Sequence, residues 1–99
     1  MGLVIGCDVG TQSTKGVAID SSGTVLATAT ARYGVAFPGP NWAEQRADDW
    51  VDGLTKVLSH LAADLGAAAA DVTHLAVDAQ VDGVVAVDQA LRPLAPATP

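Results

Sequence analysis

The chain has 99 residues, of which 49% are hydrophobic and 16% are charged, so it has the length of one small domain and is too apolar for a disordered segment. Its formal net charge of −6 at pH 7 argues against nucleic acid as a partner, because a phosphate backbone would repel it. Its apolar runs are too short to span a membrane and its first residues lack the positive flank of a signal peptide, so we expect neither a membrane partner nor secretion.

A meander of three strands is predicted over the first third of the chain. Residues 3–9 form a nearly continuous apolar run, which indicates a strand buried on both faces. Residues 15–20 lie between two turn signals and predict a second strand, and residues 25–32 alternate small apolar with polar side chains, as in a strand with one solvated face. The only cysteine, Cys7, is expected to be a core residue. Because it cannot form an internal disulfide, a reducing cytoplasm is the expected location.

Residues 47–65 predict the best-defined element, an amphipathic helix. Large apolar residues recur there at helical spacing, two aspartates lie in the first turn, where the helix dipole favours them, and Gly66 follows as a stop signal. Trp42 and Trp50 are expected to be packing anchors rather than platforms for a sugar. Arg46 is expected to be a surface cation, because arginine lacks the acceptor that an N-cap requires.

The last third of the chain carries weaker signals. Residues 67–70 either prolong the helix or form a linker. Residues 74–77 and 84–87 predict short strands on either side of a turn at 80–83, and the two strands are candidates for a hairpin. Residues 91–99 include three prolines and predict a connecting segment.

The turn between the first two predicted strands holds the residue types that phosphate binding needs. The segment reads Asp8-Val9-Gly10-Thr11-Gln12-Ser13-Thr14-Lys15. Backbone amides in a glycine turn can point at phosphate oxygens, hydroxyls add donors, a lysine adds positive charge, and an aspartate can hold Mg²⁺ directly or through water. The segment differs from a Walker loop, because its lysine lies in a strand and not at the start of a helix. From the spacing alone, an ordinary hairpin with polar turn residues is an equal alternative.

Four short motifs occur in order along the whole chain: Asp8-x-Gly10-Thr11-x-x-x-Lys15, Trp42-x-Glu44-Gln45, Gln80-x-x-Gly83 and Leu91-Arg92-Pro93. Each is weak alone, but their joint occurrence is specific, and by it the chain resembles the FGGY carbohydrate kinases, in particular their xylulokinase-like members. The resemblance implies an α/β chain with part of a ribonuclease-H-like fold, the fold of the actin-like ATPases: a three-stranded meander, a helix and then further strands.

The same resemblance implies a parent enzyme of which this chain is one part. Residues 1–99 would form the amino-terminal part of the first ATPase-like domain of a sugar kinase, without the rest of that domain and without the second domain. The parent would be a phosphotransferase that moves the ATP γ-phosphate to a hydroxyl of a small-molecule sugar or polyol. Because the general base of the family lies downstream, we expect no catalytic residue in this chain and no activity from it alone.

The resemblance also implies the cofactors ATP and Mg²⁺ and the residues that would meet them. Asp8 would orient Mg²⁺, directly or through water. The residues that would form the phosphate site are Gly10, Thr11, Gln12, Ser13 and Lys15.

The substrate would lie beside the turn formed by Gln80, Val81, Asp82 and Gly83. Xylulokinase-like members usually have Gln-Met-His-Gly in this turn, so the exchange of an imidazole for the carboxylate of Asp82 leaves the sugar or polyol open. Asp82 either accepts hydrogen bonds from substrate hydroxyls or only supports the turn before Gly83.

Two other functions would keep the same fold. One is an ATPase module of the actin and heat-shock superfamily, whose first hairpin has a similar Asp-x-Gly-Thr. The other is a noncatalytic interaction domain. The segments at residues 42–45 and 80–83 favour the kinase, because an ATPase has no need for them.

A single helix covers only one face of a sheet, so the other face of the predicted strands is expected to be bare in this chain. The isolated chain is therefore expected to be poorly stable or to self-associate. The sequence leaves the oligomeric state open, and a homo-oligomer is compatible with it.

Overall fold

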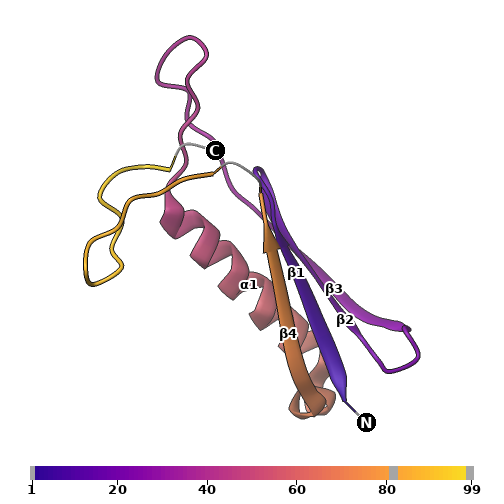
Figure 1. The fold of residues 1–99 in the computed structure, drawn as a ribbon. Helices are drawn as coiled ribbons and strands as arrows, with labels where there is room; N and C mark the ends of the chain where they lie inside the picture. The colour runs from indigo at the N-terminus through magenta and orange to yellow at the C-terminus, as the bar shows by residue number, and fades with distance from the viewer. Residues whose placement is uncertain (1, 81–82, 98–99) are drawn as a thin grey trace.

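The computed structural model describes residues 2–80 and 83–97. Its elements are, in chain order, the strands β1 (Leu3–Val9), β2 (Ser13–Ile19) and β3 (Val25–Arg32), the helix α1 (Ala47–Leu65), the 3-10 helix η1 (Gly66–Asp71) and the strand β4 (Val72–Ala79). The four strands form one sheet in the order β3-β2-β1-β4, and α1 lies across it (Figure 1). The predicted meander and the predicted helix are both confirmed.

The direction of β4 differs from the prediction. Strand β4 pairs in parallel with β1 after the helical crossover and forms no hairpin with residues 84–87. Parallel neighbours need such a crossover, whereas a hairpin would have made the two strands antiparallel. Residues 84–87 are not a strand either: Val87 forms only an isolated bridge to Pro93, which has no N–H with which to extend a ladder.

Both ends of α1 follow from its sequence. The helix ends at Leu65 and is capped by Gly66, whose φ of 58° lies in the left-handed region that favours glycine and whose N–H donates to the carbonyl oxygen of Ala62. Arg46 makes no side-chain capping bond, as predicted, and its ion pair with Asp48 is long, at 4.0 Å, and exposed. Such a pair contributes little to stability. Residues 67–70, which the sequence assigned either to a longer helix or to a linker, belong to η1.

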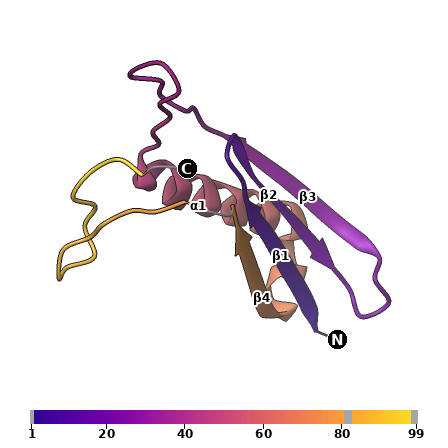
Figure 2. The ribbon, with the colours of Figure 1, turned by 45° about the horizontal axis from the view of Figure 1, so that its top comes forward.

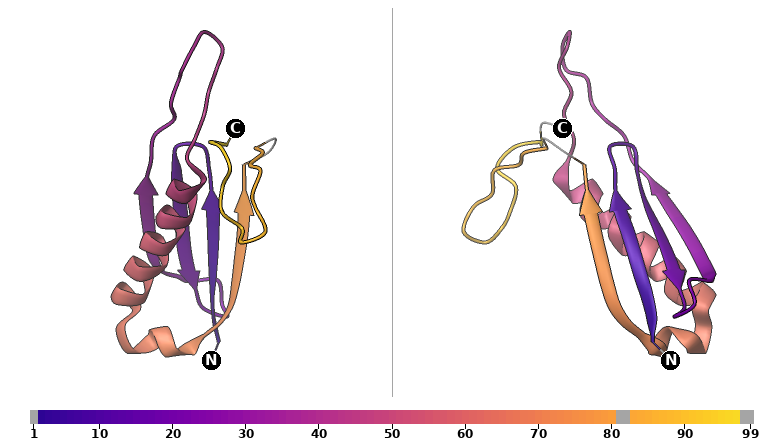
Figure 3. Two further views of the ribbon diagram at one scale, coloured as in Figure 1. Left: turned by 90° about the vertical axis from the view of Figure 1, so that its left-hand side faces the viewer. Right: turned by 45° about the vertical axis from the view of Figure 1, so that its right-hand side comes forward.

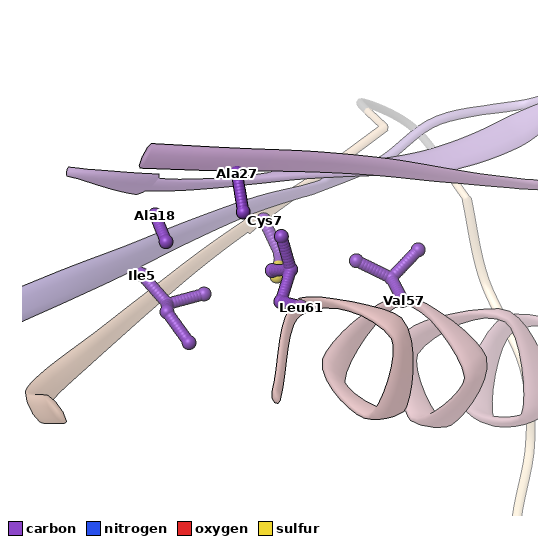
Figure 4. Packing of buried hydrophobic residues seen from close by; sticks show 6 residues of the cluster. All are labelled: Ile5, Cys7, Ala18, Ala27, Val57 and Leu61. Carbon is purple, nitrogen blue, oxygen red and sulfur yellow. The ribbon is translucent and has the colours of Figure 1, made fainter. Parts of the chain in front are cut away.

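The core lies between α1 and one face of the sheet. Val57 and Leu61 of α1 are fully buried there, and small side chains on the facing strands let the helix sit close to the sheet. Figure 4 shows these two residues with the strand residues of the cluster, Ile5, Cys7, Ala18 and Ala27. Cys7 is a core residue, as predicted, and burial raises the pKa of its thiol, which keeps it protonated.

The other face of the sheet has no covering layer within the described residues (Figures 2 and 3). We call it the open face; the strand pairing assigns to it Val4, Gly6, Asp8, Lys15, Val17, Thr28, Thr30, Ala76 and Asp78. The apolar run of β1 indicated burial on both faces. Within the described residues, however, buried and more exposed residues alternate along this strand, so only one of its faces is covered. The bare face that the single helix predicts is present.

The loop before α1 stands away from the sheet (Figure 1). Trp42 in this loop is 64% exposed, so the prediction that it is a packing anchor is wrong, because the loop finds no surface to bury the indole. The radius of gyration is 15.5 Å, against about 13 Å for a compact chain of this length. The chain is therefore more extended than a compact domain of the same length. Over residues 2–80 and 83–97, no helix combines the length and the apolar character that crossing a membrane requires.

The isolated chain is expected to self-associate through β4. Within the described residues this strand is an edge of the sheet, and Leu75 and Val77, which face the helix side, are about half exposed. A bare apolar edge pairs readily with another chain, and a charge on it opposes that pairing. Sedimentation velocity over a concentration series should show association that Val77→Lys reduces, whereas Val51→Lys on the exposed side of α1 should not. A sharp, concentration-independent melt of a monomer would contradict this prediction.

Candidate functional site

The candidate residues gather at one end of the sheet. The turn between β1 and β2, the carboxyl end of β4 and the start of α1 all lie there, away from the amino terminus (Figures 1 and 3). The carboxyl ends of parallel neighbours such as β1 and β4 meet at the same edge, which is where open α/β sheets bind ligands. The backbone N–H of Gln80 donates to the carbonyl oxygen of Val9 at 3.0 Å and holds the two ends together.

The carbonyl groups of the turn are tied to the body of the chain. The Tyr33 hydroxyl donates to the carbonyl oxygen of Gly10, and the Tyr33 backbone N–H donates to that of Gln12. The side-chain amide of Gln45 donates to the carbonyl oxygen of Thr11. Three consecutive carbonyls of the turn thus have partners, and the turn is held in one conformation.

The N–H groups of Thr11 and Gln12 consequently point away from the body of the chain. In a trans peptide the N–H is antiparallel to the carbonyl of the preceding residue, and those carbonyls, on Gly10 and Thr11, face inward. Among the residues that the structure describes, neither N–H has a hydrogen-bond partner. The N–H of Gly10, by contrast, is used within the turn, since it donates to the carbonyl oxygen of Ser13 at 2.9 Å. Two neighbouring outward amides form a site suited to an anion.

A row of polar side chains crosses the open face next to this turn. The strand register places Asp78, Asp8, Lys15 and Thr30 side by side on β4, β1, β2 and β3. These residues line a concavity of about 550 Å³ on that face. Within residues 2–80 and 83–97, Lys15 forms no ion pair, so its ammonium group is free to meet an anion.

Asp78 is a site residue that the sequence analysis missed. The pKa of its carboxyl is raised, first because it shares a hydrogen bond with the Asp8 carboxyl, then because of desolvation and of the Asp8 charge. The parallel pairing of β1 and β4 would have identified Asp78, because this pairing places it beside Asp8 in the polar row of the open face.

The two carboxylates fit Mg²⁺. No group of three or more potential metal ligands exists among the described residues, so the chain offers a cation Asp8 and Asp78 and little else. Magnesium is usually held by one or two carboxylates together with substrate phosphates and water. The donor set therefore agrees with the predicted role of Asp8.

The raised pKa of Asp78 predicts how stability changes with pH. A folded-state pKa above the usual 3.8 means that the folded chain holds this proton more tightly, so the stabilisation is full at low pH and is lost as the pH rises through the raised value. At neutral pH Asp78→Asn should therefore melt at a higher temperature than the wild type, and the difference should vanish below about pH 4. Asp71 is exposed and lies outside the row, so Asp71→Asn is the control and should leave the melting temperature at neutral pH close to that of the wild type. A destabilised Asp78→Asn variant at neutral pH would refute this interpretation.

The predicted substrate residues lie beside the turn as far as they are described. The Thr11 hydroxyl donates to the Gln80 side-chain oxygen at 3.1 Å. A Cβ on Gly83 would lie 3.6 Å from Gln80 Cγ and 3.9 Å from Trp50 Cη2, so Gly83 lies next to both side chains and leaves the space of one methyl group beside them. Val81 and Asp82 lie outside the described residues. The phosphate candidate Thr11 and the substrate candidate Gln80 are therefore direct neighbours.

The other predicted phosphate residues stand around the same turn. Gly10 approaches the main chain closely, because a Cβ there would lie 3.1 Å from the Ser13 carbonyl oxygen. Gln12 is exposed, Ser13 is half-buried, and Lys15 is exposed two residues beyond the turn. The sequence analysis gave no structural role to Tyr33 and named Gln45 only as part of the motif Trp42-x-Glu44-Gln45. Both support the turn from inside, through contacts that depend on the tertiary fold.

The chain is similar to known sugar kinases over its whole length. The family model described as "FGGY family of carbohydrate kinases, N-terminal domain" matches residues 3–98. The xylulose kinases of Lactococcus lactis subsp. lactis (strain IL1403) and Bacillus subtilis (strain 168) are each 30% identical to it, over 98% and 90% of the chain but only 19% and 18% of those proteins. The crystal structure of xylulose kinase from Rhodospirillum rubrum superposes with a TM-score of 0.88 at 31% identity, over 97% of this chain and 20% of that one. The chain thus spans about a fifth of the length of these relatives, and its fold is part of the actin-like ATPase fold.

Proposed function

Because the chain belongs to the FGGY family of carbohydrate kinases, we propose that it forms the amino-terminal part of an ATP-dependent kinase that phosphorylates a hydroxyl of a sugar or polyol. Residues 1–99 would be part of the first ATPase-like domain of that enzyme. The rest of that domain and a second domain would supply the general base and the adenine pocket. The chain alone is then expected to be inactive.

The observation that carries this proposal is the hydrogen bond between Thr11 and Gln80. Thr11 belongs to the turn with two outward amides, and Gln80 opens the predicted substrate turn. Phosphoryl transfer requires the γ-phosphate and the acceptor hydroxyl to lie in contact and in line. The adjacency of the two candidate sites supports a transferase over a domain that binds only one ligand.

Each residue then has a defined task. The N–H groups of Thr11 and Gln12 donate to phosphate oxygens, with Ser13 beside them, and Lys15 adds positive charge from the open face. Mg²⁺, held by Asp8 directly or through water with Asp78 beside it, would neutralise charge on the phosphates when bound. Gly10 lets the main chain of the turn close tightly.

The acceptor is proposed to be a sugar or polyol, with xylulose the first compound to test, because the similar proteins are named as xylulose kinases. Gln80 would hydrogen-bond its hydroxyls, and Asp82 would add an acceptor where the family usually has histidine. Gly83 leaves room beside Gln80. The enzyme is inferred to work in the reducing cytoplasm, with ATP and the small-molecule acceptor as its partners and with a homo-oligomer compatible with the chain.

The test is acceptor-dependent release of ADP by the complete protein. A panel of ketoses, aldoses and polyols with Mg²⁺ and ATP should include at least one compound that raises ADP release far above the rate without acceptor. ADP release that no acceptor changes would instead favour the ATPase alternative, and no ATP binding at all would favour an interaction domain. In the isolated chain, Mg²⁺ with ATP should shift amide NMR signals within residues 10–14. Shifts confined to other residues would count against the phosphate site.

A further inference from the structure

Gln45 is the buried centre of a hydrogen-bond network. The network joins the proposed phosphate-binding turn between β1 and β2 to Gln80, which opens the proposed substrate turn. Gln45 itself is only 2% exposed, although it is polar and lies in the loop just before α1. A buried amide is costly unless all of its hydrogen bonds are made. In Gln45 they are: the nitrogen donates to the carbonyl oxygens of Thr11 and Gly34, and the oxygen accepts from Trp50 and Gln80.

The network has a fixed direction. The indole N–H of Trp50 can only donate, so its 3.1 Å contact identifies the Gln45 atom that it meets as the oxygen. Gln80 must then present its nitrogen to Gln45, at 3.2 Å, and its oxygen to Thr11. The orientation of the Gln80 amide, with its oxygen toward Thr11, therefore follows from Gln45.

The main chain of Gln45 is fixed as well. Its N–H donates to the carbonyl oxygen of Ala97 at 2.9 Å, and its carbonyl oxygen accepts from the N–H of Ala97. Ala97 is itself fully buried. Both the backbone and the side chain of Gln45 are therefore held in place, as a residue that positions others must be.

From this network we infer that Gln45 is a positioning residue for both halves of the proposed kinase site. Through the Thr11 carbonyl it turns the N–H of Gln12 outward toward the phosphates. Through its contact with Gln80 it fixes which way the Gln80 side-chain amide is turned, and this amide would meet the sugar or polyol. The inference rests on the proposed function for its ligands, but its structural part concerns only residues that the structure describes.

Gln45→Met tests it, because methionine keeps the volume and removes both the donors and the acceptor without adding charge. In the complete protein this variant should weaken MgATP binding and raise KM for the acceptor by about tenfold each, the typical effect of losing one hydrogen bond that holds a ligand-binding group in place. Hydrogen exchange should become faster in the peptide that spans residues 9–14 and stay unchanged at the centre of α1. Trp50→Phe, which frees only the orientation of the amide, should show the same changes at a smaller size.

The matched control is Val57→Ala, which weakens the core without touching the network. It should lower the melting temperature and leave the MgATP affinity, the acceptor KM and the exchange of residues 9–14 as in the wild type. If Gln45→Met binds both ligands normally, or if Val57→Ala reproduces its losses, the inference is wrong. If the wild type binds MgATP but phosphorylates no acceptor, the sugar-kinase proposal fails, and MgATP affinity and exchange still decide the role of Gln45. If the wild type binds no MgATP, both fail.

Discussion

In the complete protein, Asp8→Asn should lower kcat/KM by about 10²- to 10³-fold, because the acceleration that a bound metal supplies to phosphoryl transfer is worth several kcal/mol. Asparagine has nearly the shape of aspartate, so the change removes the charge that would hold Mg²⁺ and leaves the packing intact. Asp8 lies on the open face between Asp78 and Lys15, next to the turn with the outward amides of Thr11 and Gln12. Steady-state kinetics over a range of Mg²⁺ concentrations, with the active acceptor from the panel, measure the loss.

The same variant should gain thermal stability. Replacing the Asp8 carboxylate removes the side-chain hydrogen bond, and with it the neighbouring charge, that raise the pKa of Asp78, so the Asp8→Asn variant should melt at a higher temperature than the wild type at neutral pH. A gain in stability together with a loss of activity marks a carboxylate kept for function. The control Asp71→Asn removes an exposed charge outside the row and should change neither quantity. Activity of Asp8→Asn within threefold of the wild type would exclude a direct role for Asp8 in transfer.

Gly16→Ala should destabilise the chain by about 1–3 kcal/mol, the usual effect of overpacking a core. A Cβ on Gly16 would lie 2.4 Å from Val57 Cγ1, 3.0 Å from Leu61 Cδ1 and 3.3 Å from Cys7 Sγ. Val57 and Leu61 are fully buried, so neither can move aside without shifting α1 against the sheet. The denaturant midpoint in urea measures the effect.

Gly6→Ala is the matched control for this prediction. Gly6 lies in the neighbouring strand β1 but on the open face, where a Cβ would meet Val17 Cγ1 at an ordinary 3.9 Å. The same substitution should therefore leave the midpoint unchanged or raise it, since alanine loses less conformational freedom on folding than glycine. Equal midpoints for Gly16→Ala and Gly6→Ala would contradict the close packing of α1 against β2 at Gly16.

Local signals in the sequence predicted the parts of the fold that local physics decides. The helix bounds followed from the 3.6-residue spacing of its apolar residues and from Gly66, and the meander followed from apolar runs broken by turn residues. The composition of the turn at Gly10 and Thr11 predicted a phosphate site, which stays a prediction. Periodicity reports which face of an element is apolar, but not which element will cover it; within the described residues only one face of β1 is covered.

The tertiary structure alone decided which distant residues meet. Residues 74–77 read equally well as half of a hairpin, and only the crossover through α1 made β4 the parallel neighbour of β1. That pairing sets Asp78 beside Asp8 and Gln80 beside Thr11, and it gives the buried amide of Gln45 a partner from each turn. The sequence determined the chemical groups and the elements that carry them; the site arose from contacts between residues far apart in the chain, which no local preference encodes.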